Sequence, residues 1–303
     1  MKKLAVIDIG SNTVLVTGGF LNPEGKLQIL FDHGEVARLS EGLQDDGLLQ
    51  KAAKERVLKR LKEFREIANS HGVNELHAAG TAAFRRARDG IDFARQIEAE
   101  LGISVRILSG DEEAYYSYQS AKNDFAKAGE NLGMIDIGGG STEYVFGEAG
   151  FKQSLPIGTV RFSEKFIKTH PIEDKNWNLL CEEIQNNLRN SLANINTIPK
   201  TWVAVAATPA SLAAIYLKLP KYQPERIHGL VLKTKALEDL VEALRKKSLA
   251  QRIALPGMHP DRAELIPIGG AILVESLRFL GLEEVTISDR GLRYGLLQEA
   301  LRS

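Results

Sequence analysis

Two patterns of hydrophobic and polar positions alternate along the chain. Short apolar runs bounded by glycine, proline or asparagine are typical of β-strands, whereas apolar residues three or four positions apart are typical of helices. The short runs predict strands at 4–9, 13–20, 26–31, 75–80, 105–108, 201–206 and 284–288. The wider spacing predicts helices at 48–70, 93–101, 111–126, 162–168, 174–195, 209–217, 234–246, 261–280 and 291–301, with a loop at 35–43 and a turn or short helix at 81–88. Strands that alternate with helices indicate the α/β class.

One glycine-rich sequence occurs twice. Residues 6–13 read VIDIGSNT and residues 134–142 read MIDIGGGST, and each is followed by a second apolar run. An apolar run, a tight glycine turn and a returning apolar run predict a β-hairpin. The aspartates Asp8 and Asp136 lie 128 positions apart, about the length of one domain. The repeat therefore predicts two similar domains, at 1–127 and 128–290, with their boundary in the polar segment 127–132.

The residues of each turn are suited to binding phosphate. Glycine lets the backbone approach a ligand closely, so that several N–H groups can point at one phosphate, and serine or threonine adds a hydroxyl donor. An aspartate at the end of the preceding strand can hold Mg²⁺, directly or through water, which makes Asp8 and Asp136 candidate metal ligands. The alternative is an ordinary hairpin that uses glycine only for positive φ, and the second copy argues against it. The candidate phosphate-binding residues are Gly10, Ser11, Asn12, Thr13, Gly138, Gly139, Gly140, Ser141 and Thr142.

Composition and charge narrow the possible partners. The 303 residues carry 39 Lys and Arg against 39 Asp and Glu, a formal net charge of zero. This balance argues against a protein that coats nucleic acid or an anionic membrane through bulk charge, so we expect neither partner. The single cysteine, Cys181, excludes an intrachain disulfide framework and a cysteine-rich zinc site. The first apolar run ends at Asp8, too short for a signal peptide, and no run approaches the roughly 18 apolar residues of a membrane span, so a cytoplasmic location is expected.

Seven stretches resemble, in order, the motifs of one known family. They are DIGSNT at 8–13, VARLSEGL at 36–43, GTAAFRRA at 80–87, LSGDEEA at 108–114, IDIGGGSTE at 135–143, LPIGTVR at 155–161 and SDRGLRYGL at 288–296. The whole chain resembles the exopolyphosphatase/guanosine pentaphosphate phosphohydrolase (Ppx/GppA) family, and its length resembles that of the short, two-domain members. The resemblance implies an α/β fold of two ribonuclease-H-like domains of the actin-like, sugar-kinase and heat-shock ATPase superfamily. It also implies an active-site cleft between the domains, and a C-terminal helix, about 291–303, that belongs to the first domain.

The resemblance implies a specific activity. Family members use Mg²⁺ and water to cleave the terminal phosphoanhydride of inorganic polyphosphate, releasing orthophosphate, so this chain is expected to be an exopolyphosphatase. The resemblance assigns the general base to Glu113, with its neighbour Glu112 the nearest alternative. It assigns a phosphate clamp to Arg85, because a guanidinium binds phosphate in a bidentate manner. It makes Arg38 a second phosphate contact and Glu143 a further metal ligand, and it leads us to expect a homodimer.

One segment departs from the family pattern. Where a Gly-Gly-Thr type of segment is common, this chain has Ala206 and Ala207 before Thr208. Two additional methyl groups hinder the close approach of a nucleoside, which favours plain polyphosphate over guanosine pentaphosphate. Thr208 is expected to cap the helix that follows.

Other functions stay open at the level of sequence. A guanosine pentaphosphate 5′-phosphohydrolase would act on the same kind of terminal phosphoryl group with the same residues. An ATP-dependent kinase of the superfamily would need a full nucleoside site, against which the two alanines argue. A non-enzymatic sensor of polyphosphate or nucleotide would keep both turns but would not need Glu113 together with Asp136. A neutral, two-domain chain is expected to hold only the end of a polyphosphate, and so to favour short chains or low processivity.

Overall fold

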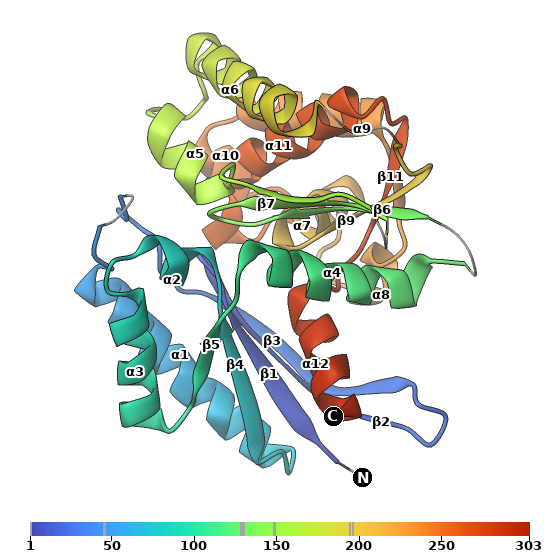
Figure 1. Cartoon of the computed structure of the whole chain (residues 1–303). Coiled ribbons are helices and arrows are strands. Elements are labelled where there is room, and N and C mark those ends of the chain that lie inside the picture. Colours follow the sequence, from blue (N-terminus) through green and yellow to red (C-terminus); the bar gives the residue numbers. More distant parts are fainter. Residues whose placement is uncertain (1, 45–46, 128–130, 148–149, 194, 196) are drawn as a thin grey trace. The chain divides into compact units, whose positions relative to one another are not determined.

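The computed structural model describes residues 2–44, 47–127, 131–147, 150–193, 195 and 197–303. The chain divides into two compact units, one formed by Met1–Ser120 with Leu292–Ser303 and the other by Ala121–Gly291. The division falls inside helix α4 (Gly110–Phe125), earlier than the predicted boundary at 127–132, of which residues 128–130 lie outside the described part. Each unit contains one β-sheet with helices packed against it (Figure 1).

The first sheet begins as a meander and continues with parallel strands. Its order is β3-β2-β1-β4-β5, in which β1, β2 and β3 are antiparallel neighbours and β1, β4 and β5 run parallel. The central strand β1 is apolar on both faces, as is typical of a strand covered on both sides. The strands span Leu4–Ile9 (β1), Thr13–Leu21 (β2), Leu27–Val36 (β3), Glu75–Gly80 (β4) and Val105–Ile107 (β5).

The second sheet repeats this arrangement and adds one strand. Its strands span Leu132–Ile137 (β6), Thr142–Phe146 (β7), Lys152–Leu155 (β8), Thr201–Val205 (β9), Val231–Lys233 (β10) and Glu284–Ile287 (β11). The order β10-β11-β9-β6-β7-β8 contains, read from its other end, a three-stranded meander followed by two parallel strands, with β10 added antiparallel at the edge. The predicted α/β fold with two related sheets is therefore confirmed.

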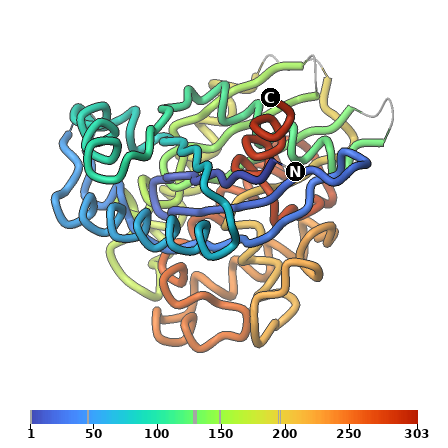
Figure 2. Tube along the Cα trace, turned by 90° about the horizontal axis from the view of Figure 1, so that it is seen from below, coloured from blue at the N-terminus to red at the C-terminus, as the bar shows by residue number. Residues whose placement is uncertain are grey.

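Helices cover both faces of the first sheet because the side chains of β1 alternate between them. Ala5, Ile7 and Ile9 join the core under α1 (Lys51–Ser70) and α3 (Gly90–Leu101). Leu4 and Val6 point to the other face, where they pack against Leu297 and Leu301 of the C-terminal helix α12 (Leu292–Arg302). In both Figure 1 and Figure 2 this red helix runs beside the blue first strands. A short helix, α2 (Ala82–Arg86), follows β4.

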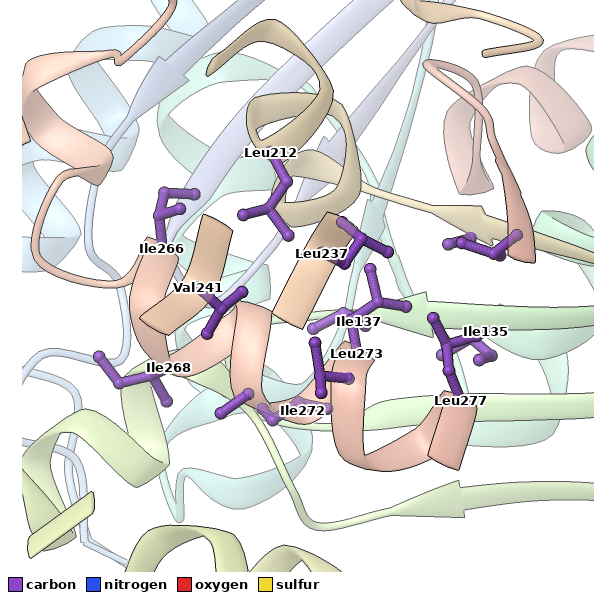
Figure 3. Close-up of a cluster of buried hydrophobic side chains, with 14 of the residues drawn as sticks. Ile135, Ile137, Leu212, Leu237, Val241, Ile266, Ile268, Ile272, Leu273 and Leu277 are labelled. Carbon is purple, nitrogen blue, oxygen red and sulfur yellow. The ribbon is translucent and has the colours of Figure 1, made fainter. Parts of the chain in front are cut away.

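The core of the second unit forms around one buried helix. Almost every residue of α11 (Ile266–Phe279) is buried, as expected of a helix that is apolar all round. Figure 3 shows Leu273 and Leu277 of α11 directed toward Ile135 and Ile137 of β6. Asp136, between these two isoleucines, points to the opposite face of the sheet. The other helices of this unit are α5 (Thr159–Phe166), α6 (Asp174–Leu192), α7 (Ala207–Tyr216), α8 (Pro224–Ile227), α9 (Thr234–Arg245), α10 (Leu249–Ile253) and a 3₁₀ turn (Pro260–Arg262).

The structure differs from the sequence prediction mainly at short or edge elements. Strands β8 and β10 and helices α8 and α10 were not predicted, because segments of three to five residues are too short to show a periodicity. Strand β3 continues to Val36, although residues 35–43 were predicted to be a loop. Its polar end is compatible with a strand because β3 lies at the edge of its sheet. Among the described residues, no helix combines the length and apolar character that crossing a bilayer requires.

A charged network holds α12 against the meander of the first sheet. Arg293 donates through Nη2 to Asp32 Oδ2 at 3.0 Å and through Nε to Thr17 Oγ1 at 2.8 Å, and the Tyr294 hydroxyl donates to Asp32 Oδ2 at 2.5 Å. Burial raises the pKa of the Asp32 carboxyl, but the Arg293 charge and the hydrogen bonds from Arg293, Tyr294 and Thr17 outweigh it and leave that pKa below its usual value. The ionised carboxylate of Asp32 therefore stabilises the folded first unit.

We expect Asp32→Asn to lower the stability of the first unit by about 2 kcal/mol at neutral pH, since it removes charge-assisted hydrogen bonds. A carboxyl whose pKa is lowered by folding stabilises above its unfolded pKa, about 3.9, and this contribution is lost as pH falls through the folded pKa. The advantage of the wild type should therefore disappear on acidification below about pH 4. Urea unfolding of the wild type and of Asp32→Asn, from neutral to acidic pH, measures the difference in their free energies of unfolding. The control is Asp92→Asn, which removes a carboxylate from an exposed pair with Arg95. If the stability of both variants responded equally to pH, the stabilising role of the Asp32 carboxylate would be contradicted.

Candidate active site

The turn after β1 is held so that its carbonyl groups are already hydrogen-bonded. Gly10 N donates to Thr13 O at 2.9 Å and closes the hairpin. Asn12 O accepts from the amides of residues 37 and 38, both at 2.9 Å, and Ser11 O accepts from Ser40 N at 3.0 Å. The amides of Ser11 and Asn12 have no hydrogen-bond partner within the described chain. Backbone N–H groups that are unpaired at a tight turn are suited to binding an anion.

The turn after β6 has the same backbone design. Gly138 N donates to Ser141 O at 2.9 Å, and two amides at the start of α5 donate to the turn: Thr159 N to Gly138 O at 3.0 Å and Val160 N to Gly139 O at 2.9 Å. A Cβ on Gly158 would meet Gly139 O at 2.4 Å, so glycine is required where α5 meets the turn. The 128-residue offset seen in the sequence thus relates two turns that are closed by equivalent backbone hydrogen bonds.

The two turns differ in their side chains. Ser11 is only 4% exposed, and its Oγ, like Asn12 Oδ1, is buried without a hydrogen-bond partner among the residues that the structure describes. Burying such a polar atom costs free energy unless a ligand or a water molecule forms a hydrogen bond with it. In the second turn, Thr142 is fully buried and its hydroxyl donates to Ile157 O at 2.6 Å, so Thr142 stabilises the hairpin and is not available to a ligand. Gly139, Gly140 and Ser141 leave their backbone amides as the groups that can contact phosphate there.

Three parallel strands of the first sheet end level with one another. Ile9 is the register partner of Gly80, and Gly80 is that of Ile107. The turn at 10–13, helix α2 and the start of α4 therefore emerge at the same edge of the sheet. The carboxyl ends of parallel strands are the usual place for a ligand site in α/β proteins. The structure thus brings together three groups of candidate residues that are far apart in the sequence.

Arg85 and Glu113 form an ion pair at this edge. Nη1 of Arg85 contacts Glu113 Oε1 and also donates to Leu108 O at 2.7 Å. The Glu113 side chain is 10% exposed, so its carboxylate lies in a largely dehydrated position next to the guanidinium. A carboxylate held at a fixed place beside an arginine is suited to accept a proton from water.

Glu112 has a different role from its neighbour. Its backbone N–H donates to Ser109 Oγ at 3.2 Å, and its carboxylate accepts from Ser109 N at 2.8 Å, which together form a capping box at the start of α4. Glu112 also pairs with Arg106. The hydrogen bond from the Ser109 backbone, followed by that from Arg106, lowers the pKa of the Glu112 carboxyl. The Glu112 carboxylate is therefore held by the helix cap and Arg106, whereas that of Glu113 contacts Arg85.

Arg38 lies in the segment that packs on the first turn. It is a non-glycine residue with φ 49°, in the left-handed region, and is intermediate in exposure. Its side chain has no hydrogen-bond or ion-pair partner within the described residues. A guanidinium that is not committed to a protein carboxylate and whose backbone rests on Asn12 O is well placed to reach a phosphate at the turn.

The second hairpin carries a pair of carboxylates. Asp136 and Glu143 are direct cross-strand partners, so their side chains lie next to each other on one face of the sheet. Ser154 Oγ donates to Glu143 Oε1 at 2.7 Å and orients that carboxylate. At the corresponding place in the first hairpin, Asp8 is paired with Leu15, so only one carboxylate is present.

Asp136 and Glu143 are candidate ligands for the expected magnesium ion. The described residues contain no group of three His, Cys, Asp or Glu that could enclose a metal. Mg²⁺ usually takes one or two carboxylates and completes its octahedron with waters and substrate phosphates. The donor set of Asp136 and Glu143 therefore fits Mg²⁺, whereas a metal that needs a complete protein cage would not fit. The assignment of Asp8 as a ligand stays a prediction.

Ala206 has a backbone conformation that is normally reserved for glycine. It follows β9 and has φ 79° and ψ −174°. Helix α7 begins at Ala207, and its N-cap is Ala206, which makes no side-chain cap. The prediction that Thr208 caps this helix is therefore wrong, because Thr208 lies within the first turn and is 6% exposed. The alanine retains a glycine-type backbone while adding a methyl group.

Fold and site together define a class of protein. Two sheets with the same meander-plus-parallel order, each with a phosphate-type turn after its first strand, are the architecture of the actin-like ATPase superfamily.

Comparison with known proteins identifies the family. The model of the Ppx/GppA phosphatase family matches residues 21–303. Exopolyphosphatase 2 of Mycobacterium tuberculosis is 27% identical over 315 residues, covering 98% of each chain. A crystal structure of the Aquifex aeolicus Ppx/GppA family member has a TM-score of 0.82 and 28% identity, covering 99% of this chain and 98% of that one. The chain belongs to the Ppx/GppA phosphatase family.

Another relative is much longer than this chain. The bifunctional 3-dehydroquinate synthase/phosphatase of Fusobacterium nucleatum is 27% identical over 312 residues. The match covers 99% of this chain and 46% of that protein, so the chain spans about half the length of that relative.

We expect Ala206→Gly to stabilise the second unit. The alanine conformation costs on the order of 1–3 kcal/mol, whereas glycine costs roughly 0.5–1 kcal/mol in extra chain entropy, so a net gain of about 1 kcal/mol is expected. Thermal unfolding measures the gain. Ala207→Gly, one residue later in the helix, is the control and should destabilise slightly. A melting temperature that falls equally in both variants would mean that Ala206 is unstrained.

Proposed function

We propose that the protein is an exopolyphosphatase that removes orthophosphate from the end of inorganic polyphosphate. The observation that carries the proposal is the Arg85–Glu113 pair at the strand edge that also bears the Ser11–Asn12 turn. Membership of a phosphatase family and the names of its M. tuberculosis relatives, exopolyphosphatases 1 and 2, support it. A sensor would have no need of a dehydrated carboxylate beside a phosphate-binding arginine.

In the proposed mechanism the protein positions groups and moves one proton. The amides of Ser11 and Asn12 and the Ser11 hydroxyl hold the terminal phosphate, with Arg85 and Arg38 neutralising its oxygens. A guanidinium has five N–H donors, so Arg85 can hold Glu113 through Nη1 and still bind phosphate. Glu113 keeps its place through this contact.

The chemical step breaks one phosphoanhydride bond. A water oxygen forms a bond to the terminal phosphorus while the bond from that phosphorus to the bridging oxygen breaks. Glu113 accepts the proton of the water, and the bridging oxygen stays with the shortened chain. The products are orthophosphate and polyphosphate shorter by one unit. Asp136 and Glu143, which both belong to the second unit, would hold Mg²⁺, and the ion would supply positive charge.

The substrate is tested by measuring phosphate release in parallel. Short-chain polyphosphate, long-chain polyphosphate and guanosine pentaphosphate are compared by kcat/KM, each with Mg²⁺ and with EDTA. We expect polyphosphate to be preferred, short chains to be used at least as well as long ones, and EDTA to abolish release. A preference for guanosine pentaphosphate would establish the alternative substrate and overturn the inference from Ala206 and Ala207. Highly processive use of long chains would contradict the argument from zero net charge.

A matched pair of variants tests the general base. Glu113→Gln should lower kcat by about 10²–10⁴-fold, because the proton acceptor is lost while shape is kept, and binding of polyphosphate should persist. Glu112→Gln changes the adjacent residue in the same way but touches the capping box, so it should cost up to about 1 kcal/mol of stability and keep turnover near normal. Steady-state kinetics and thermal unfolding of both variants are the measurements. Turnover lost in Glu112→Gln instead would reverse the assignment.

A further inference from the structure

The loop at 37–41 carries strain at Arg38, one of the two arginines that the proposed function uses to bind phosphate. Arg38 has φ 49°, and a non-glycine residue in this region persists only where its surroundings fix it. The loop is fixed from one side by the turn, because the Ala37 and Arg38 amides both donate to Asn12 O. These two bonds hold the loop against the turn but do not by themselves set the torsion angles of Arg38.

A single side chain from helix α1 fixes the loop from the other side. Arg56 Nε donates to Ala37 O at 2.7 Å, and Nη2 donates to Arg38 O at 3.2 Å. Nη2 also donates to Glu41 Oε2 at 2.7 Å, which orients the guanidinium. The contacts that the structure gives for Arg56 are therefore to the loop and not to the turn.

The two carbonyl oxygens that Arg56 binds lie on either side of the Arg38 Cα. Ala37 O belongs to the peptide plane before the Arg38 Cα, and Arg38 O belongs to the plane after it. The angle between these two planes is what φ and ψ of Arg38 describe. A planar guanidinium that binds both oxygens holds the two planes in one relation, which a point-like ammonium cannot do.

We infer that Arg56 is a positioning residue: it holds Arg38 in the left-handed conformation and so directs the Arg38 guanidinium to the phosphate at the Ser11–Asn12 turn. The inference rests on the proposed function. It assigns Arg56 no contact with substrate. Its effect should therefore appear in substrate binding, should act through Arg38, and should vanish when Arg38 is absent.

The test is a double-mutant cycle on the full chain with short-chain polyphosphate. Arg56→Ala and Arg38→Ala should each raise KM by about tenfold, the scale of one lost charge-assisted contact, with kcat changed much less. The double variant should be no worse than Arg38→Ala alone. Calorimetric binding of polyphosphate to the same variants in a Glu113→Gln background should show the same pattern without turnover. Additive effects of the two substitutions would overturn the inference.

Two further variants separate positioning from general stability. Arg60→Ala, one turn further along α1, removes an arginine that pairs with Glu35 and Glu63 and should leave KM unchanged. Arg56→Lys keeps the charge and serves if the alanine variant does not fold; it should raise KM in the same direction. An unchanged KM in Arg56→Lys, or an equal rise in Arg60→Ala, would refute the role of Arg56. If the wild type neither binds nor cleaves polyphosphate, the proposed function fails instead.

Discussion

Both halves of the molecule depend on how the carbonyl groups of a hairpin turn are hydrogen-bonded. In each half, the chain that leaves the third strand of the meander donates its amides to those carbonyls. Peptide groups are planar, so fixing the oxygens on one side directs the N–H groups to the other. A phosphate site of this kind uses backbone dipoles rather than surface charge. The proposed polyanionic substrate is therefore compatible with the zero net charge of the chain.

The two copies have diverged in what surrounds this shared turn. In the first unit the donating segment is a loop with an arginine, the turn carries the buried Ser11 hydroxyl, and the neighbouring strand ends bear Arg85 and Glu113. In the second unit the donating segment is the start of a helix, the turn is nearly all glycine, and the strands behind it hold two adjacent carboxylates. In the proposed mechanism the first copy supplies the arginine contacts and the proton acceptor, and the second copy supplies the carboxylates for a cation.

The sequence was sufficient for the features that repeat or that follow from periodicity. The duplicated turn, the strands from β1 to β7 except the end of β3, and the long helices could be predicted from it, because strong apolar patterns specify them.

Residue roles that depend on contacts in the folded chain could not be predicted from the sequence. Glu112 and Glu113 are identical in chemistry and adjacent, and only packing makes one a cap and the other a buried partner of Arg85. Arg56 gave no signal, because a basic residue on an amphipathic helix is indistinguishable from a solvated one until its carbonyl partners are known. Thr142 had the right residue type and the wrong orientation.

The position of α12 has a consequence for how the chain is made. The face of β1 formed by Leu4 and Val6 is covered by Leu297 and Leu301, which are synthesised after the whole second unit. During synthesis the second unit, residues 121–291, can complete its core while this face of the first sheet is still exposed to water. The first unit is therefore begun before the second and completed after it, so the nascent chain carries an open apolar surface, of the kind that chaperones protect, while the second unit is synthesised.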